Sequence, residues 1–147
     1  MLRYSPFFFL LLTACQTTAP ATETTTSAQA APTTELRGTK WVLHSLAGQP
    51  VQPTSTKELY LLISPDQPQA EGQASCNRFR GPVELPAAQQ LRFGALMSTR
   101  MACPDLAIET SFTNALTNTR TYQISRDTLR LYGEPAAGPL AELHQGR

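Results

Sequence analysis

Hydrophobic and polar residues alternate along much of the chain after residue 36, and this pattern predicts β-strands. Apolar residues within 41–46 predict a first strand, which a turn sequence ends at 47–50. The run 59–63 is continuously apolar and is followed by a Ser-Pro-Asp turn, which favours a strand buried on both of its faces. Alternation within 91–95 predicts a further strand.

Residues 70–85 also alternate, but the phase of their alternation shifts near Cys76 and Asn77. Gly72 and Gly81 flank this point. Because side chains on a strand alternate with a period of two, a phase shift between two glycines predicts a tight turn or a β-bulge.

The hydrophobic period changes to three and four residues at 104–118, which predicts one amphipathic helix. The apolar face of this helix carries Leu106, Ile108, Phe112, Ala115, Leu116 and Thr119. Pro104 suits the first helical position, where no amide donor is needed. Asp105 and Glu109 lie near the N-terminal, positive end of the helix dipole.

The C-terminal part of the chain predicts two alternating strands, at 122–124 and 129–131, joined by a turn at 125–128. Residues 140–143 predict a last strand at the edge of the sheet. The element order is a run of strands, one helix and then two or three strands. This order predicts an α+β fold, in which an antiparallel sheet curls around a core that the helix closes.

The N-terminus has the character of an export signal. Arg3 precedes an apolar run at 7–12, and Leu12-Thr13-Ala14-Cys15 has the form of a lipobox. The Cys15 thiolate would be the nucleophile that accepts a diacylglyceryl group, and the small residues before it would admit the peptidase. We therefore predict a lipoprotein signal peptide at 1–14 and lipidation at Cys15. The alternative is an apolar N-terminus with a chance cysteine.

Residues 16–35 contain no Leu, Ile, Val or aromatic residue and consist almost entirely of small and polar residues. Such a segment cannot bury enough apolar area to fold, so we predict that 15–35 forms a lipidated N-terminus and a disordered tether with a reach of about 25 Å. Gln16 follows Cys15 in place of Asp. By resemblance to Gram-negative lipoprotein sorting, this favours the outer membrane, with membrane lipid as a partner and the domain facing the periplasm.

Composition narrows the classes of function. The chain has 147 residues, which is enough for one domain after the signal and tether. Its formal net charge of +1 argues against a nucleic-acid partner, because no basic excess is present to neutralise phosphates. We expect a monomer without a cofactor.

Cys76 and Cys103 remain once Cys15 carries lipid, and an exported compartment is oxidising, so we predict a disulfide between them. With 26 residues between the cysteines, the bond would be worth about 3–4 kcal/mol. The alternative is a pair of buried free thiols. Two cysteines without matched histidines do not make a zinc site, and we predict no metal site.

Four arginines lie in one region of the sequence with only Glu84 opposing them: Arg78, Arg80, Arg92 and Arg100. They would suit a phosphate-bearing lipid headgroup or a carboxylate partner, and a solvated face is the alternative. Asn77 suits a turn, because Asn tolerates left-handed backbone geometry, and contact with a ligand is the alternative. The possible binding residues are therefore Asn77, Arg78, Arg80 and Arg100.

Catalytic motifs are not evident in the sequence. His44 and His144 are far apart, and no spacing suggests a Ser-His-Asp, Cys-His or HExxH arrangement or a glycine-rich phosphate loop. We predict that the protein is not an enzyme and has no catalytic residues.

Four segments together resemble the META domain family, whose bacterial members include the HslJ-like heat-shock lipoproteins: Gly38–Leu43, Gly72–Gly81, Ser98–Cys103 and the Leu129-Arg130-Leu131 hairpin. The resemblance covers 36–143 and leaves 144–147 as a C-terminal tail. Ser75 departs from the glycine that many relatives place before Cys-Asn, so we expect this turn to differ from theirs. The resemblance implies a compact, barrel-like antiparallel sheet with one amphipathic helix packed against it. The family has no assigned catalytic activity, and its bacterial members are associated with envelope stress and antibiotic tolerance.

These expectations combine into one function. The sequence favours an outer-membrane-anchored, non-catalytic binding module that holds a periplasmic protein or an apolar ligand and supports envelope integrity or stress tolerance. The alternatives are a periplasmic enzyme inhibitor, an enzyme, and an assembly chaperone or pilot lipoprotein.

Overall fold

The computed structural model of the chain describes residues 35–53, 56–133 and 138–147. The predicted signal peptide, the lipidation site Cys15 and all but the last residue of the predicted tether lie outside these ranges. Within them, no helix has both the length and the apolar character that a membrane crossing requires.

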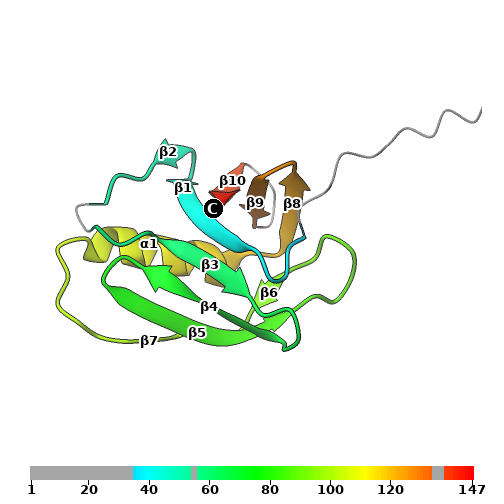
Figure 1. Cartoon of the computed structure of the whole chain (residues 1–147), viewed down its shortest axis with the longest axis horizontal. Helices are drawn as coiled ribbons and strands as arrows, with labels where there is room; N and C mark the ends of the chain where they lie inside the picture. Colours follow the sequence, from blue (N-terminus) through cyan, green and yellow to red (C-terminus); the bar gives the residue numbers. More distant parts are fainter. Residues whose placement is uncertain (1–34, 54–55, 134–137) are drawn as a thin grey trace, which may run out of the picture.

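Ten strands and one helix make up the described part of the chain (Figure 1). Their bounds are β1 (Lys40–Leu46), β2 (Gln49–Pro50), β3 (Tyr60–Ile63), β4 (Gln69–Ala74), β5 (Asn77–Glu84), β6 (Arg92–Phe93), β7 (Met97–Ser98), α1 (Leu106–Asn118), β8 (Thr121–Ser125), β9 (Thr128–Tyr132) and β10 (Pro139–Gln145). The strands form one antiparallel sheet in the order β6-β5-β4-β3-β1-β10-β9-β8, and β2 and β7 add to β1 and β5.

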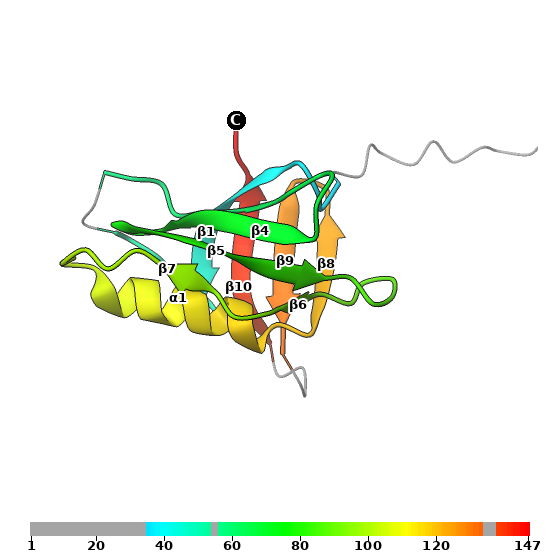
Figure 2. The same cartoon turned by 90° about the horizontal axis from the view of Figure 1, so that it is seen from below.

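The two ends of this strand order meet, so that the sheet is nearly closed. Gln90, just before β6, bridges to Thr121 at the start of β8. The amide of Leu91 donates to the carbonyl of Arg120 at 3.0 Å, and the amide of Tyr122 donates to Gln89 at 2.9 Å. The predicted α+β fold, a barrel-like antiparallel sheet with one helix packed against it, is confirmed (Figure 2).

The last strand is not at an edge, and that prediction was wrong. β10 lies between β1 and β9, and it extends through His144 and Gln145, which the sequence assigned to a tail. Leu43 pairs with Leu143, so the two ends of the described domain lie side by side in the sheet. Alternation of hydrophobic residues shows which face of a strand is buried but not which strands are its neighbours, and edge and central strands of an antiparallel sheet therefore read alike.

The apolar run of β3 is buried on one face only, in contrast to the prediction. Leu61 and Ile63 point into the core and are fully buried, whereas Tyr60 and Leu62 are half-buried on the outer face. The ammonium of Lys40 lies 5.0 Å from the centre of the Tyr60 ring, which gives this outer aromatic a cation–π contact.

The phase shift near Cys76 is a tight hairpin turn, one of the two predicted possibilities. Ala74 pairs with Asn77, so Ser75 and Cys76 alone form the loop between β4 and β5. A Cβ added at Gly72 would lie 2.0 Å from the carbonyl oxygen of Tyr60 and 2.5 Å from the Phe79 ring. Glycine at this position therefore lets the Phe79 ring lie directly over β4.

The helix begins two residues later than predicted. α1 starts at Leu106 with Asp105 as its N-cap, so Pro104 precedes the helix and does not occupy the first helical position. Phe112 is buried as predicted and meets Phe79 edge to face, with ring centres 5.8 Å apart. This pair joins the helix to β5 at the centre of the core.

The first turn of the helix faces the core differently from the prediction. Leu106 is 57% exposed, whereas Asp105 and Glu109 are only 6% and 8% exposed. Hydrophobic spacing alone placed Leu106 inside, but a buried acid needs hydrogen-bond donors from another part of the chain. The donors are Ser75 in the β4–β5 turn, for Asp105, and Asn77 at the start of β5, for Glu109.

Candidate functional site

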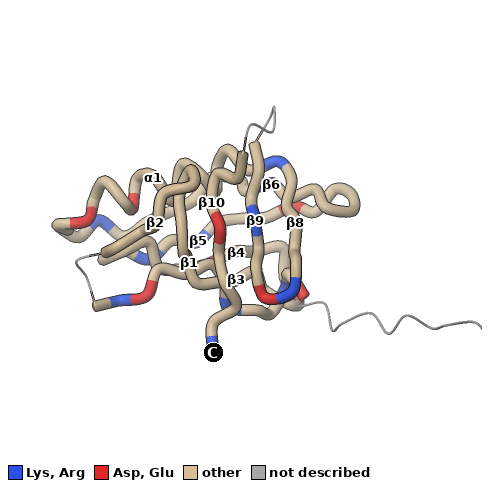
Figure 3. The backbone as a smooth tube through the Cα atoms, turned by 90° about the horizontal axis from the view of Figure 1, so that it is seen from above, with Lys and Arg blue, Asp and Glu red and all other residues tan. Residues whose placement is uncertain are grey.

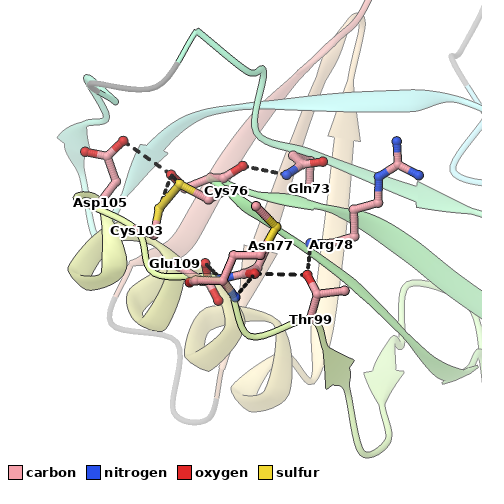
Figure 4. The surroundings of a disulfide bond; sticks show 10 residues. Gln73, Cys76, Asn77, Arg78, Thr99, Cys103, Asp105 and Glu109 are labelled. Atoms are coloured by element: carbon pink, nitrogen blue, oxygen red, sulfur yellow. Dashed lines mark hydrogen bonds between the residues drawn. A yellow bond between two sulfur atoms is a disulfide. The ribbon is translucent and has the colours of Figure 1, made fainter.

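A disulfide joins Cys76 in the β4–β5 turn to Cys103, in the segment that leads into α1 (Figure 4). The Cα atoms of the two cysteines are 5.8 Å apart. The structure thus contains the predicted disulfide, and the alternative of two free thiols is wrong. The bond fixes the turn against the start of the helix.

Asn77 follows the disulfide-bonded turn residue and is 2% exposed. Its Oδ1 accepts from the Thr99 hydroxyl at 2.9 Å and from the Met101 amide at 2.8 Å. Its Nδ2 donates to the Met101 carbonyl at 3.2 Å and to Glu109 Oε2 at 2.9 Å. A side-chain amide has two donor hydrogens and two acceptor lone pairs, so all its capacity is used. Asn77 therefore links three segments: the β4–β5 hairpin, the loop that follows β7, and the helix.

The left-handed residue of the turn is Ser75, not Asn77. Ser75 has a φ of 79° and is fully buried, whereas Asn77 is not among the described residues with positive φ. The Ser75 hydroxyl donates to Asp105 Oδ2 at 3.3 Å and lies 3.3 Å from the Cys103 sulfur. The Ser75 carbonyl accepts from Gln73 Nε2 at 2.6 Å. These contacts offset the cost of left-handed geometry, about 1–2 kcal/mol for a residue with a Cβ.

We call Ser75, Asn77, Asp105, Glu109 and the disulfide the Asn77 cluster. Among the described residues, no buried side-chain nitrogen or oxygen lacks a hydrogen-bond partner. The cluster therefore explains why two acids are buried at the start of the helix, and it acts as a fastening between elements.

The four arginines separate into different places. Arg78 and Arg80 lie on the outer face of β5, because β5 alternates strictly between buried and exposed residues. Arg92 is on β6 in register with Glu84, and Arg100 is exposed in the loop between β7 and α1. Figure 3 shows basic and acidic positions spread over several elements and not gathered into one patch.

Arg78 and Arg80 line a groove of about 400 Å³ on the outer face of β3, β4, β5 and β7. The residues that line it are Tyr60, Glu71, Gly72, Arg78, Phe79, Arg80, Met97, Ser98 and Thr99. Asn77 faces the opposite side of β5, while Arg92 and Arg100 are not among the lining residues. Of the sequence-predicted binding residues, the structure thus brings two together at a hollow.

The two groove arginines differ in their partners. Arg80 Nη2 lies 3.2 Å from Glu71 Oε2, and both side chains are about half-exposed. Arg78 forms no ion pair with any residue that the structure describes, and Figure 4 shows its side chain directed away from the Asn77 cluster. Beside it, Met97 is 70% exposed. The groove thus combines one available cation with an aromatic ring and an exposed thioether.

The two histidines, which the sequence placed far apart, lie against each other. His44 is on β1 and His144 is on β10, and their rings stack with centres 4.5 Å apart and planes 20° apart. The pairing of the first and last long strands brings them together. Only knowledge of the strand order could have revealed this proximity from the sequence.

Glu142 lies beside His144 on the same face of β10. Its Oε1 is 3.3 Å from His144 Nε2, and its Oε2 accepts from Arg130 Nε at 2.7 Å. Figure 3 shows the acidic position on β10 beside a basic one on β9. Burial acts to raise the pKa of Glu142, but hydrogen bonds from His144 and Arg130 and the charge of Arg130 outweigh it and lower that pKa. We call His44, Glu142 and His144 the His44 cluster.

Known proteins share this architecture. The model of the META domain family matches residues 34–143. An NMR structure of a protein from Burkholderia xenovorans is 28% identical and superposes with a TM-score of 0.60, covering 76% of this chain and 83% of that one. A second NMR structure is 23% identical with a TM-score of 0.58, covering 75% and 91%, and shows the fold alone. No curated protein gives a match. Because the family model spans well over half of the chain, this protein belongs to the META domain family.

Proposed function

We propose that this META domain protein is an outer-membrane lipoprotein, anchored through Cys15, that binds a periplasmic protein without catalysis and supports envelope integrity under stress. The observation that carries the binding role is the groove on β3, β4, β5 and β7, where Arg78 is available. The ligand whose chemistry fits it is an extended segment with a carboxylate next to an apolar side chain. Arginine binds a carboxylate through two parallel hydrogen bonds.

The groove has the size and lining of a recognition site. Its volume of about 400 Å³ lies within the range usual for ligand sites, about 300–1,000 Å³. Met97 offers an adaptable apolar surface, and Tyr60 offers a rigid one. Glu71 occupies Arg80, so one carboxylate of the partner is enough to match the charge.

The floor of the groove is held in place from below. The amide of Arg78 donates to the Thr99 hydroxyl at 3.1 Å, and the amide of Thr99 donates back to the carbonyl of Arg78 at 3.0 Å. The same Thr99 hydroxyl donates to Asn77, the central residue of the Asn77 cluster. A ligand would therefore meet a backbone that is already ordered, which reduces the entropy lost on binding.

One feature supports binding over catalysis, and another supports the proposed position at a membrane. The Ser75 hydroxyl is fully buried, so a substrate could not reach it as a nucleophile. The lipobox at Leu12–Cys15 and the residue Gln16 support anchoring in the outer membrane. A tether of about 25 Å would let the groove reach periplasmic proteins near the bilayer.

Crosslinking in intact cells, followed by affinity purification and mass spectrometry, tests this proposal with four forms of the full chain. The forms are the wild type, Cys15→Ala, Arg78→Glu and Arg92→Glu. Arg92 is the matched control, because it is also an exposed strand arginine but does not line the groove. The wild type and Arg92→Glu should recover the same partner, while Arg78→Glu should lose it at least about tenfold, since reversing the charge places like charges together.

Other results would contradict part of the proposal or identify a different function. Equal recovery by Arg78→Glu would remove the groove as the site. Equal recovery by Cys15→Ala would show that anchoring is not needed. If the captured partner is a hydrolase that loses activity when bound, the protein is an inhibitor, and if it is an outer-membrane assembly complex, the protein is a chaperone or pilot. Recovery of every form alone, with a bound lipid or small molecule, would end the protein-partner proposal.

A further inference from the structure

The His44 cluster lies on the outer face of β1 and β10 and has no part in the groove. It contains the only two histidines of the chain. From its geometry, we propose that His44, Glu142 and His144 bind one divalent transition-metal ion of the Zn²⁺ type, with water or an anionic group in the remaining position. This inference is independent of the proposed function.

The three side chains share the outer face of β1 and β10, at the point where a β-bulge shifts the strand register. Leu43 pairs with Leu143, and Ser45 pairs with Glu142, so His44 is the extra residue with no direct partner across the strands. The carbonyl of His44 accepts from the Val51 amide at 2.9 Å, which holds the bulge. Bulges redirect side chains and are over-represented near functional sites. Because Leu43 is buried, alternation turns His44 outward at this bulge, where its ring stacks on His144.

The donor set matches the chemistry of zinc-like ions. Imidazole nitrogen suits Zn²⁺, Cu²⁺ and Ni²⁺, and two histidines with one glutamate form a known set for zinc sites that keep an exchangeable position. The three donor atoms lie within 4.8 Å of one another. Bonds of about 2.0–2.1 Å to a tetrahedral ion place ligand atoms about 3.4 Å apart, so the widest pair would approach by at most about 1.4 Å.

This closure needs only side-chain rotation. The stacked rings must turn so that their nitrogens point at a common ion. His44 is exposed, and the side chain of His144 is 43% exposed, so neither ring is locked in place by packing. Glu142 is already oriented, because Arg130 binds its Oε2 and leaves Oε1 toward His144. Arg130 thus acts as the outer-shell partner that fixes a carboxylate ligand.

There is also room for the remaining ligand. A hollow of about 370 Å³ opens beside the two histidines and is lined further by Val42, Glu58 and Arg147. Glu58 is paired with Lys40 and does not lie with the three clustered donor atoms of His44, Glu142 and His144. The positive charge of Arg147 at the hollow favours an anionic group over a second metal ion.

Zn²⁺ alone, titrated into the full-length chain, tests the site. The chain would carry Cys15→Ala to remove the one cysteine outside the disulfide, have no histidine tag, and be kept in mild detergent. Calorimetry should give one ion per chain. NMR of the imidazole protons should show both histidines shifting together, and no other histidine is present to obscure them.

Variants then assign the ligands. His44→Gln, His144→Gln and Glu142→Gln should each weaken Zn²⁺ binding by at least about tenfold, the lower end of what loss of even an outer-shell partner costs. Glu58→Gln is the matched control, because it changes another carboxylate near the same hollow, and it should bind as the parent does. A dispersed amide spectrum for each variant shows that it is folded.

Three results would overturn the inference. In the first, Zn²⁺ leaves both imidazole signals unmoved at equimolar concentration. In the second, folded His44→Gln and His144→Gln bind as tightly as the parent. In the third, Glu58→Gln loses as much affinity as Glu142→Gln, which would place the ion elsewhere in the hollow.

Discussion

The Asn77 cluster and the His44 cluster are both groups of polar side chains held between segments far apart in sequence, yet they differ in almost every physical respect. The Asn77 cluster is buried, is closed by a disulfide, and uses all the hydrogen-bonding capacity of its central amide. The His44 cluster lies at the surface, and its two rings touch by stacking. The first arrangement favours stability, and the second leaves donor atoms for a ligand.

Burial determines how much each cluster contributes to the free energy of unfolding. A buried polar group that loses its partner costs about 1–3 kcal/mol, and more if a charge is involved. An exposed ion pair is worth about 0–1 kcal/mol. Changes in the Asn77 cluster should therefore reduce stability, whereas changes in the His44 cluster should alter binding and leave stability nearly intact.

The largest effect is expected for Asn77→Ala. The substitution would leave the Glu109 carboxylate and two backbone groups of Met101 without a buried partner. We expect a loss of about 3–5 kcal/mol in the free energy of unfolding, measured by denaturant titration of the Cys15→Ala chain. Asn118→Ala is the control, because the Asn118 side chain donates to the exposed carbonyl of Asn114, and the substitution should cost less than about 1 kcal/mol. Equal losses for the two variants would show that the Asn77 cluster has no special role.

The next largest loss of stability is expected when the disulfide is removed. Replacing both cysteines, as Cys76→Ser with Cys103→Ser, should cost about 3–4 kcal/mol because the unfolded chain is freed from a closed loop. A thiol reductant should lower the stability of the parent by a similar amount and leave the double variant unchanged. Sensitivity of the double variant to the reductant would mean that the reductant acts on something other than this bond.

The sequence predicted much of the Asn77 cluster's framework but not its interior. Alternation located the hairpin, the cysteine pair predicted the disulfide, and hydrophobic spacing located the helix. It could not show that Asp105 and Glu109 are buried and Leu106 exposed. A buried acid depends on donors such as Asn77, about 30 residues earlier, and local periodicity holds no information about them.

The sequence failed for the His44 cluster for a different reason. The two histidines belong to the first and last strands in the sequence. Period-two alternation gives the face on which each residue lies but not the order of the strands in the sheet. The same limit applied to the arginines. Alternation does place Arg78 and Arg80 on one face of β5, but the positions of Arg92 and Arg100 depend on how the chain turns after Glu84.

A pair of substitutions at Ser75 separates backbone strain from hydrogen bonding within the Asn77 cluster. Ser75→Ala keeps a Cβ at a φ of 79° and loses the bond to Asp105, so it should cost about 1–2 kcal/mol. Ser75→Gly loses the same bond but relieves the left-handed strain, so it should be about 1 kcal/mol more stable than Ser75→Ala. Denaturant titration of both variants checks the difference. If they are equally stable, Ser75 carries no backbone strain.

The smallest effect is the pH dependence that Glu142 contributes in the His44 cluster. With a chelator present, the lowered pKa means that folding favours the ionised carboxylate. This contribution is present above the unfolded-state pKa of about 4.3 and is lost as the pH falls through the lower pKa of the folded state. Because the Glu142 side chain is 22% exposed, the free energy of unfolding of the parent should exceed that of Glu142→Gln by less than about 1 kcal/mol at pH 7. The gap should close below about pH 4 in denaturant titrations. If the two proteins instead differed by several kcal/mol in stability at neutral pH, Glu142 would stabilise the fold as strongly as Asn77 does. The contrast between the two clusters would then no longer hold.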